Sequence, residues 1–396
     1  MAMKDPVVIV GAARTPMGGL LGDFKDLPAS RLGAAAIAAA VERAGVKPDS
    51  VEEVIMGCVL SAGQGQAPAR QAALAAGLPL SAGATTVNKI CGSGMKATML
   101  AHDLLLAGSN QVMIAGGMES MSNAPYLLEK ARAGFRLGHG RIIDHMFFDG
   151  LEDAYEKGRL MGTFAEDCAE NFQFSREQQD DFAIASVSRA QKAVTSGSFK
   201  AEITPVTVKS GKDERLVDTD EQPMKAKLDK IRSLKPAFRE GGTVTPANSS
   251  SISDGGAALL LMRRSEAEKR GLTPLATICG HATFADKPSL FPSAPVGAMR
   301  KLLDRVGWTA GQVDLFEINE AFAVVTMVAM REMDLPHDKV NIHGGACALG
   351  HPIGASGARL IVTLLSSLKQ CGAKRGVASL CIGGGEATAM AFELAS

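Results

Sequence analysis

The sequence contains one strand and helix pattern twice, and this duplication constrains the fold more than any other feature. Each copy opens with a short apolar strand, continues with a helix that ends at a glycine, and returns through a second strand. The segments concerned are 7–10, 31–44 and 54–60 in the first copy and 276–279, 295–306 and 315–318 in the second. Such alternation is typical of parallel strand pairing with helices on the sheet faces. We therefore predict an α/β protein built from two related halves.

Each copy then continues with a small-residue turn, a further helix, and a strand that ends in glycines. In chain order these segments are 92–94, 95–106, 112–114 and 116–117 in the first copy and 355–357, 358–369, 377–382 and 383–385 in the second. Two such halves packed together would bring their glycine-rich strand ends to a shared site, as in open α/β folds.

The pattern changes between the halves, from about 120 to 270. Residues 166–196 have the periodicity of one amphipathic helix or two, with a start signal at Ser175. Residues 200–250 are polar and rich in Lys, Pro and Gly, and 225–239 holds six basic residues against one Asp. Such a run is either a solvated surface or a phosphate-binding lid inserted between the halves.

Composition narrows the class of protein. The chain has 396 residues, enough for two or three domains, and its 42 basic residues balance 42 acidic ones. Zero net charge gives no reason to expect a nucleic acid or an anionic membrane as partner. The seven cysteines include no CxxC pair, which favours free thiols in a reducing compartment. Because no apolar stretch suits a signal peptide or a membrane span, we expect a cytoplasmic protein.

Cys91 stands where an extended segment meets the start of a predicted helix. Unsatisfied N–H groups and the positive end of the helix dipole favour a thiolate over a thiol there, which would lower the pKa of Cys91. Cys91 is therefore a candidate covalent nucleophile. The alternative is an ordinary buried cysteine, which is the commoner role of this residue type. This segment alone supports the two interpretations about equally.

Three later segments also carry chemistry. Asn319 and Glu320 enter an otherwise apolar run at a strand end, where they need polar partners, although Asn319 could instead cap a helix. Residues 341–357 hold too many glycines for a regular helix, and the spacing of the histidines and cysteine there does not match zinc sites, so no metal is expected. His351, between Gly350 and Pro352, suits a fixed imidazole donor or base.

Cys381 is a second candidate thiol, at the end of strand 377–382. The glycines that follow it at 383–385 indicate either a phosphate loop or only a tight turn. Neither GxGxxG after the first strand nor GxxxxGK[ST] occurs, so nucleotide binding by those routes is not expected.

Taken together, these motifs resemble the signature of the thiolase family. The matching segments are Asn88-x-x-Cys91-Gly-Ser-Gly, Gly117-x-Glu119-Ser-Met-Ser-x-Ala-Pro125, Asn319-Glu-Ala-Phe-Ala323, Gly350-His-Pro-Ile-Gly354 and Cys381-Ile-Gly-Gly-Gly385. Further matches run over the whole chain. The resemblance implies two duplicated βαβαβαββ halves in a five-layered α-β-α-β-α fold with an inserted lid domain. We place the N-terminal half at 1–120, its continuation with the CoA-binding insert at 121–270, and the C-terminal half at 271–396.

The same resemblance implies an acyltransferase that joins two acetyl-CoA molecules into acetoacetyl-CoA and CoA, or runs the reverse thiolysis. Cys91 would carry the acyl group, and His351 would activate it. Cys381 would exchange the proton of the second acetyl-CoA. Asn319 would hold a water that, with His351, stabilises the enolate, and the N–H groups of Cys91 and Gly383 would form a second oxyanion hole. Two thiols with different pKa values suit these two tasks.

For coenzyme A, the resemblance implies that Ser250 binds the pantetheine arm, beside the apolar or small residues Leu151, Met161, Phe238, Ala321 and Phe322. The basic run 225–239 would neighbour the phosphates. Coenzyme A would be substrate and product, with no resident cofactor, and the protein would be a homo-oligomer, a dimer or a tetramer, in fatty acid metabolism.

The sequence departs from the family pattern at four places, two of which concern the substrate end. Leu160 replaces a histidine of many short-chain members, and Phe291 replaces a methionine of the acyl pocket, as in members that accept a methyl-branched substrate. His343 stands where many members have Asn, and Glu386-Ala387 replaces a common glycine-containing end.

Three alternatives stay open at this point. The first is a broader 3-ketoacyl-CoA thiolase of fatty-acid breakdown, with the same chemistry and a longer acyl pocket. The second is a condensing synthase of the same superfamily, which the second cysteine, Cys381, argues against. The third is a non-catalytic acyl-CoA-binding protein, which the intact set of site residues argues against.

Overall fold

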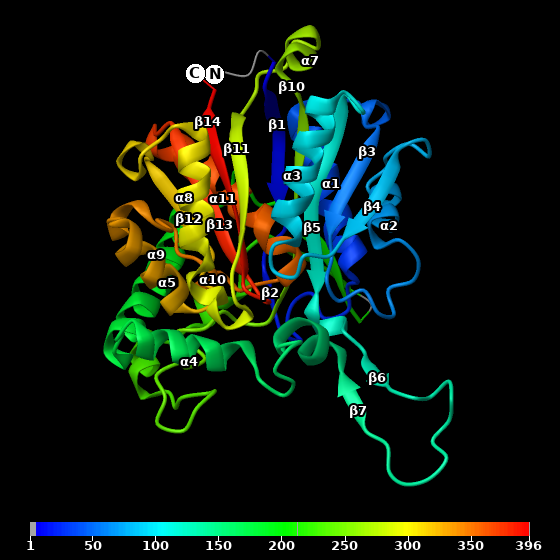
Figure 1. Ribbon diagram of the computed structural model, residues 1–396. Coiled ribbons are helices and arrows are strands. Elements are labelled where there is room, and N and C mark those ends of the chain that lie inside the picture. The colour runs from blue at the N-terminus through cyan, green and yellow to red at the C-terminus, as the bar shows by residue number, and fades with distance from the viewer. Residues whose placement is uncertain (1–4, 212, 396) are drawn as a thin grey trace.

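The computed structural model describes residues 5–211 and 213–395, and they form a five-layered α/β molecule (Figure 1). Two sheets alternate with three layers of helices. The first sheet contains β1 (Val7–Arg14), β10 (Ser253–Arg263), β5 (Val112–Ser120), β3 (Glu53–Gly57) and β4 (Gly83–Val87), in that spatial order. The second contains β11 (Ala276–Ala285), β14 (Glu386–Leu394), β13 (Arg375–Ile382) and β12 (Leu315–Ile318). The duplicated, layered α/β fold that the sequence predicts is confirmed.

The two sheets are joined edge to edge into one continuous ten-stranded sheet, because β1 pairs with β11 through Val8 opposite Thr277 and Ile9 opposite Ala276. The parallel pairing expected from the strand–helix–strand pattern occurs for β3 with β4 and β5, and for β12 with β13. The other pairs of the two sheets are antiparallel, and of these strands β14 follows β13 directly through a tight turn. Both sheets are therefore mixed.

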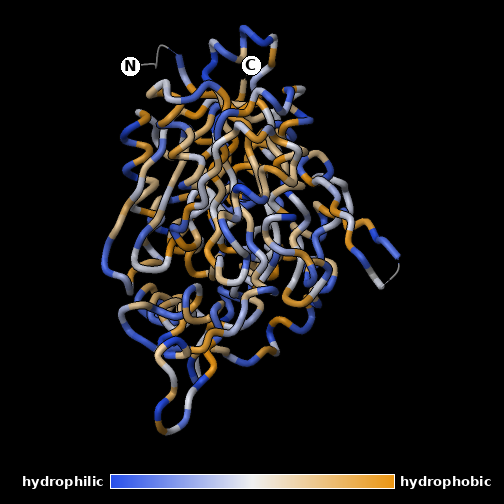
Figure 2. The backbone as a smooth tube through the Cα atoms, turned by 90° about the vertical axis from the view of Figure 1, so that its right-hand side faces the viewer, coloured by the Kyte–Doolittle hydropathy of each residue, from blue (hydrophilic) through white to orange (hydrophobic). Residues whose placement is uncertain are grey.

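The helices form three apolar layers around the sheets. The central layer contains α3 (Ser93–Ala107) and α11 (Ile353–Cys371), whose side chains share one core with both sheets. On the outer face of the first sheet lie α1 (Ala29–Ala44) and α2 (Pro68–Ala75). On the outer face of the second lie α8 (Ala294–Val306) and α9 (Ala323–Met333). Figure 2 shows hydrophobic stretches gathered in this layered part, with hydrophilic stretches at the turns.

The prediction that residues 341–357 contain no regular helix is wrong in two places. A short helix, α10, spans Ala346–Leu349, and α11 already begins at Ile353. Two glycines lie inside α11 because it packs closely against other backbone: a Cβ on Gly357 would lie 2.3 Å from the backbone nitrogen of Met95. A Cβ on Gly354 would lie 2.6 Å from a carboxylate oxygen of Glu119. Glycine here serves helix packing rather than breaking the helix.

The segment between the halves lies at the lower end of the layered core in Figure 1. Its predicted helix is two helices, α4 (Met161–Asn171) and α5 (Arg176–Ser196), and Ser175 caps α5 as expected. The remaining elements are β2 (Gly18–Gly19), β6 (Tyr126–Leu128), β7 (Ile142–Asp144), β8 (Val206–Ser210), β9 (Asp213–Val217), α6 (Glu221–Lys225) and α7 (Arg264–Lys269), with short 3-10 turns and one π-helical turn at Phe147–Leu151. The β6–β7 hairpin projects away from the molecule.

A buried ion cluster ties the insert to the first sheet. Arg14, at the end of β1, is fully buried and donates to Glu202 at 2.5 Å and to Asp220 at 2.7 Å. Such a cluster is costly to break, because removing one partner leaves a buried charge unpaired. The insert is therefore fixed beside the strand ends. Across the described residues, no helix combines the length and the apolar character that crossing a membrane requires.

Candidate active site

One cavity of about 340 Å³ lies where the insert meets the ends of both halves. Eleven of the twelve site residues predicted from the sequence line it. They are Cys91, Leu151, Met161, Phe238, Ser250, Phe291, Ala321, Phe322, His351, Cys381 and Gly383. The twelfth, Asn319, lies behind His351 and contacts it. Segments far apart in the sequence are thus brought to one site.

Cys91 sits in a tight turn between β4 and α3. Ser93 Oγ accepts from the N–H of Lys89 at 2.8 Å and donates to the carbonyl of Ile90 at 2.7 Å, and Asn88 Oδ1 accepts from the Ile90 N–H at 2.9 Å. Ile90 has a φ of 46°, a left-handed conformation that is unfavourable for a β-branched residue. The turn therefore holds strained backbone directly before Cys91, which projects the thiol into the cavity.

The expectation that the helix start lowers the pKa of Cys91 is wrong in this structure. Burial raises the pKa of the Cys91 thiol to about 11, although the N–H groups of Gly383 and of Cys91 itself face the sulfur and oppose the rise. The helix begins two residues earlier than expected, with Gly92 as its cap and Ser93 as its first residue. Loss of water around the sulfur outweighs the helix dipole here, so the resting group is a thiol.

His351 is held in one orientation by Ser356. The ring Nδ1 lies 2.5 Å from Ser356 Oγ, and that hydroxyl donates its own proton to the carbonyl of Pro352 at 2.9 Å. Ser356 Oγ must therefore accept from Nδ1–H, which leaves the lone pair on Nε2. Burial, with the charge of Arg359, lowers the pKa of His351 to about 3. The imidazole is neutral, and its basic nitrogen is Nε2.

Asn319 is not a helix cap, because α9 begins at Ala323 after Phe322. Its backbone N–H donates to the carbonyl of Ser379 on β13 at 3.0 Å, and its Nδ2 lies 3.4 Å from His351 Nε2. Its Oδ1 is buried and finds no hydrogen-bond partner within the described parts of the chain. A buried oxygen of this kind needs a donor, and a water beside His351 can supply it.

Cys381 is buried at the end of β13, where burial raises its thiol pKa well above the usual value. The next strand begins at Glu386, and Gly384 and Gly385 have φ values of 90° and 86°. These glycines form the tight turn between β13 and β14, since only glycine adopts such angles easily. Of the two interpretations of this segment, the geometry therefore supports the turn.

Two buried carboxylates support the site in ways that the sequence did not reveal. Glu119, at the end of β5, accepts from the backbone N–H groups of Val59, Leu60 and Gly354 at 2.8–3.1 Å. It thus joins the loop after β3 to the first turn of α11. Burial raises the pKa of Glu119 to about 7, although these bonds oppose the shift.

Glu320 plays the corresponding part beneath the second half. It accepts from Ser186 at 2.7 Å, from Asn341 at 2.8 Å and from the N–H of Cys347 at 3.1 Å. Burial raises the pKa of Glu320, and these bonds partly offset the effect. The hydrogen-bond partners of both carboxylates come from distant segments of the chain, so the only sequence signal for them was a charged residue inside an apolar run. Ser356, which orients His351, stands in no distinctive sequence pattern.

The wall of the cavity opposite the thiols is apolar and aromatic. Phe322 lies edge-on to Phe238, with ring centroids 5.9 Å apart, and is 6.5 Å from Phe291. Leu160 and Met161 complete this wall. Ser250 lies at the rim, where its N–H donates to the carbonyl of Ala321 at 2.9 Å. The cavity can therefore hold an apolar chain next to two thiols and an imidazole.

The basic run 225–239 lies partly at this cavity, which Ala237 and Phe238 line. Several of its charges pair with acidic side chains: Lys225 with Glu221, Arg232 with Asp181, and Arg239 with Asp167 and Glu170. The run is thus in part an ion-paired surface, and its contact with phosphate stays a prediction.

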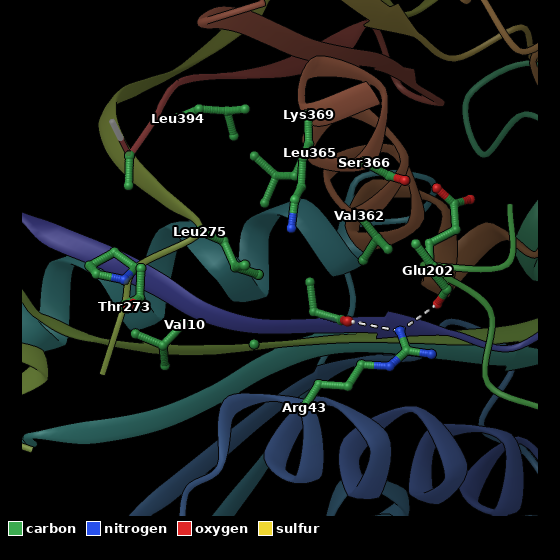
Figure 3. A pocket seen from close by; sticks show the side chains of 15 residues that line it. Val10, Arg43, Glu202, Thr273, Leu275, Val362, Leu365, Ser366, Lys369 and Leu394 are labelled. Atoms are coloured by element: carbon green, nitrogen blue, oxygen red, sulfur yellow. Dashed lines mark hydrogen bonds between the residues drawn. The ribbon is translucent and has the colours of Figure 1, made fainter. Parts of the chain in front are cut away.

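A second cavity, of about 480 Å³, differs in chemistry (Figure 3). It lies between β1, the segment before β11, and α11, and it contains Arg43, Glu202 and Lys369 among apolar side chains. Arg43 donates to the carbonyls of Ala12, Glu202 and Ile203 at 2.6–3.1 Å. Its lining, within the described chain, includes neither a cysteine nor a histidine.

Comparison with known proteins agrees with this geometry. Residues 7–265 match the model of the thiolase N-terminal domain, and 272–394 match that of the thiolase C-terminal domain. The chain is 51% identical over 391 residues to acetyl-CoA acetyltransferase 2 of Arabidopsis thaliana, covering 98% of this chain and 97% of that protein. It is 49% identical to the acetyl-CoA acetyltransferase of Cupriavidus necator, covering 98% and 99%. The crystal structure of the Bacillus anthracis acetyl-CoA acetyltransferase superposes with a TM-score of 0.96 at 40% identity, covering 99% of each chain.

Proposed function

The chain belongs to the thiolase family, and from this membership and the site we propose that it is an acetyl-CoA acetyltransferase. It is an acyltransferase that condenses two acetyl-CoA molecules to acetoacetyl-CoA and CoA, or cleaves acetoacetyl-CoA with CoA in reverse. The observation that carries the proposal is the meeting of a partly buried thiol, a buried thiol and one oriented, neutral imidazole in a single cavity. Coenzyme A is substrate and product, and the proposed chemistry needs no resident cofactor.

In the first step, Cys91 Sγ attacks the thioester carbon of acetyl-CoA. Both Cys91 and His351 are neutral at rest, so the thiol proton moves to His351 Nε2 only as the sulfur attacks. The C–S bond to coenzyme A then breaks, and the leaving thiolate takes that proton back from His351. The N–H groups of Cys91 and Gly383, which face the sulfur, are placed to stabilise the oxyanion that develops beside it.

In the second step, Cys381 would remove a proton from the methyl carbon of a second acetyl-CoA. For this, Cys381 must first be a thiolate. Its own proton would pass to His351, which the first step leaves neutral, and the Cys91 thiolate released at the end of the second step would take that proton from His351. The enolate oxygen would be met by His351 and by a water on Asn319, whose free Oδ1 supports this role. The enolate carbon attacks the acetyl-Cys91 carbonyl, the Cys91 C–S bond breaks, and acetoacetyl-CoA forms.

The pantetheine arm would enter past Ser250 and lie on the apolar wall of the cavity. Leu151, Met161, Phe238 and Phe322 supply this wall, which supports their proposed contact with coenzyme A. Lys227 and Lys235 are the members of the basic run best suited to the phosphates, because the ion pairs seen within the described chain engage the other four, Lys225, Lys230, Arg232 and Arg239.

The test is CoA-dependent cleavage of acetoacetyl-CoA, measured beside a medium-chain 3-ketoacyl-CoA. A short-chain enzyme cleaves acetoacetyl-CoA with clear preference. Comparable or better cleavage of the longer substrate would instead support a degradative thiolase of broader range. The aromatic and leucine wall at Leu160 and Phe291 is the observation that favours this second candidate, because it leaves the substrate end without a polar partner. Loss of both activities would overturn the proposal.

We also propose a cytoplasmic homo-oligomer that serves fatty acid metabolism. The seven cysteines have free thiols, which supports a reducing compartment. The projecting β6–β7 hairpin exposes large apolar side chains at Tyr126, Leu137 and Ile142, which supports a contact between subunits. Light scattering on the purified protein tests this part, and a monomer at micromolar concentration would contradict it.

A further inference from the structure

A cluster of two histidines and one aspartate lies outside the proposed active site, at the junction of the two halves. His102 and Asp103 are near the end of α3, in the first half, and His281 is on β11, in the second. The His102 side chain is nearly buried, that of His281 is 14% exposed and that of Asp103 is 55% exposed. Solvent and small ions can therefore reach the aspartate side of the cluster.

The three potential ligand atoms converge on one point. Asp103 Oδ1 lies 3.0 Å from His102 Nδ1 and 2.9 Å from His281 Nε2, and the three atoms all lie within 4.8 Å of one another. Ligands about 2.0–2.2 Å from a common ion are separated from each other by roughly 3–3.5 Å. The side chains thus already stand near the spacing that an ion requires, and the two rings are perpendicular with centroids 5.1 Å apart.

The chemistry of the donors indicates which ion would fit. Two imidazole nitrogens and one carboxylate oxygen suit Zn²⁺ and its neighbours in the first transition row rather than Ca²⁺ or Mg²⁺, which prefer oxygen ligands. Three protein ligands on the partly exposed side of the cluster leave room for water in the remaining positions. His102 Nε2 has no partner within the described residues, so the tautomer of this ring is set by the cluster.

We propose that His102, Asp103 and His281 form a binding site for a divalent transition ion of the Zn²⁺ class. The ion takes the place of the two ring protons on Asp103 Oδ1, and each ring then carries its proton on the other nitrogen. Because α3 follows Cys91 and β11 belongs to the opposite half, the ion links the two halves away from the reacting atoms. Its role is to stabilise this junction, and it takes no part in acyl transfer.

Calorimetric titration of EDTA-treated full-length protein with Zn²⁺ tests the site, with Co²⁺ absorption as a second readout. We expect saturable binding at one site per chain and a higher melting temperature. His281→Gln and Asp103→Asn should weaken that binding by roughly tenfold or more. Both side chains are partly exposed, so these variants should fold. His139→Gln is the matched control, because His139 is an exposed histidine outside the cluster.

The free thiols of the chain also bind zinc, and the variants separate the two sources. Thiol binding survives His281→Gln and Asp103→Asn alike, whereas binding at the cluster is weakened in both. The proposal is overturned if the protein binds no Zn²⁺ saturably, or if the binding isotherm is unchanged in both variants. Either result would mean that the three side chains only hydrogen-bond to one another and bind no ion.

Discussion

The two halves of the molecule place different chemistry at corresponding points of the same scaffold. The central helix of the first half, α3, begins just after Cys91, and that of the second half, α11, begins just after His351. The matching strands also differ. Strand β5 continues past its glycines to Glu119 and Ser120, whereas β13 ends at Ile382, one residue after Cys381.

This difference shows how a duplicated fold gains a site with several functions. One helix start presents a thiol and the other an imidazole, so the packing of α3 on α11 brings nucleophile and base together. One strand end carries a second thiol, and the other carries a carboxylate, Glu119, that supports the backbone. Neither half alone contains the complete set.

Removing the thiol of the first half should have the largest effect. Cys91→Ala is expected to lower thiolysis of acetoacetyl-CoA by roughly 10⁴-fold or more, because no group remains to carry the acyl chain. The melting temperature should stay close to that of the wild type, since Cys91 is only partly buried and lines a cavity. Activity in the Cys91→Ala protein would contradict the assignment of Cys91 as the nucleophile.

Removing the thiol of the second half should abolish turnover but spare the first step. Cys381→Ala is expected to release one equivalent of CoA per site from acetyl-CoA in a rapid burst and then stop, because the second acetyl-CoA keeps its proton. Stopped-flow detection of the free CoA thiol measures this. If the variant also loses the burst, Cys381 is needed in the first step, which would contradict its assignment to the second step alone.

The pH dependence of Cys91 alkylation distinguishes a buried thiol from an activated one. Because burial raises the pKa of Cys91 to about 11, its thiolate fraction increases with pH throughout the range below that value. The rate of iodoacetamide labelling, followed on the Cys91 peptide by mass spectrometry, should rise about tenfold per pH unit from roughly pH 6 to 9. A plateau beginning near pH 7 would instead indicate a thiolate paired with an imidazolium.

The contact between the two central helices should be intolerant of even one methyl group. Alanine favours helices over glycine by about 1 kcal/mol, but a Cβ on Gly357 would lie 2.3 Å from the Met95 nitrogen. We expect Gly357→Ala to lower the free energy of unfolding by about 1–3 kcal/mol or more in urea denaturation. Gly311→Ala is the control, since its Cβ would meet nothing within 4 Å. Equal stability of the two variants would contradict the close packing of α3 on α11.

The smallest expected effect concerns an ion pair that joins the two catalytic turns. Lys89, two residues before Cys91, pairs with Glu386, directly after the β13–β14 turn, and both side chains are partly buried. Lys89→Met should lower kcat a few-fold, with a coupling energy to Glu386 of about 0.5–1 kcal/mol. The double charge reversal, Lys89→Glu with Glu386→Lys, should recover part of the loss.

The control for this pair is Lys374, which pairs with Glu393 on the surface at 3.2 Å. Lys374→Met should leave kcat unchanged. A similar decrease in both lysine variants would mean that Lys89 acts only through general stability.

Much of the fold could be predicted from the sequence, because its signals are local. The apolar period and the terminal glycine predict the helix ending at Gly45 nearly to its bounds, and the start signal at Ser175 is confirmed by a capping box. The helical glycines of α11 could not be recognised, because the groups they pack against lie far away in the sequence, at Met95 of α3 and at Glu119 of β5. Without knowledge of the packing, a run of glycines in the sequence predicts the interruption of a helix.

The residues that form the candidate site could be predicted from the sequence, but their pKa values could not. Motif residues such as Phe238 and Ser250 meet at one cavity although nothing local predicts their contact. The pKa of Cys91 was predicted in the wrong direction, because burial depends on the whole fold while the helix start is visible in the sequence. Likewise Ser356, which orients His351, is a common residue whose role depends on a single hydroxyl contact.

Peptide mapping by mass spectrometry after brief incubation with acetyl-CoA tests the central claim most directly. This claim is that the first half supplies the acyl carrier and the second half supplies the acid and base groups. We predict an acetyl group on Cys91, none on Cys381, and loss of the Cys91 adduct when CoA is added. Acetyl on Cys381, or an unmodified Cys91 in an enzyme that still turns over, would contradict it.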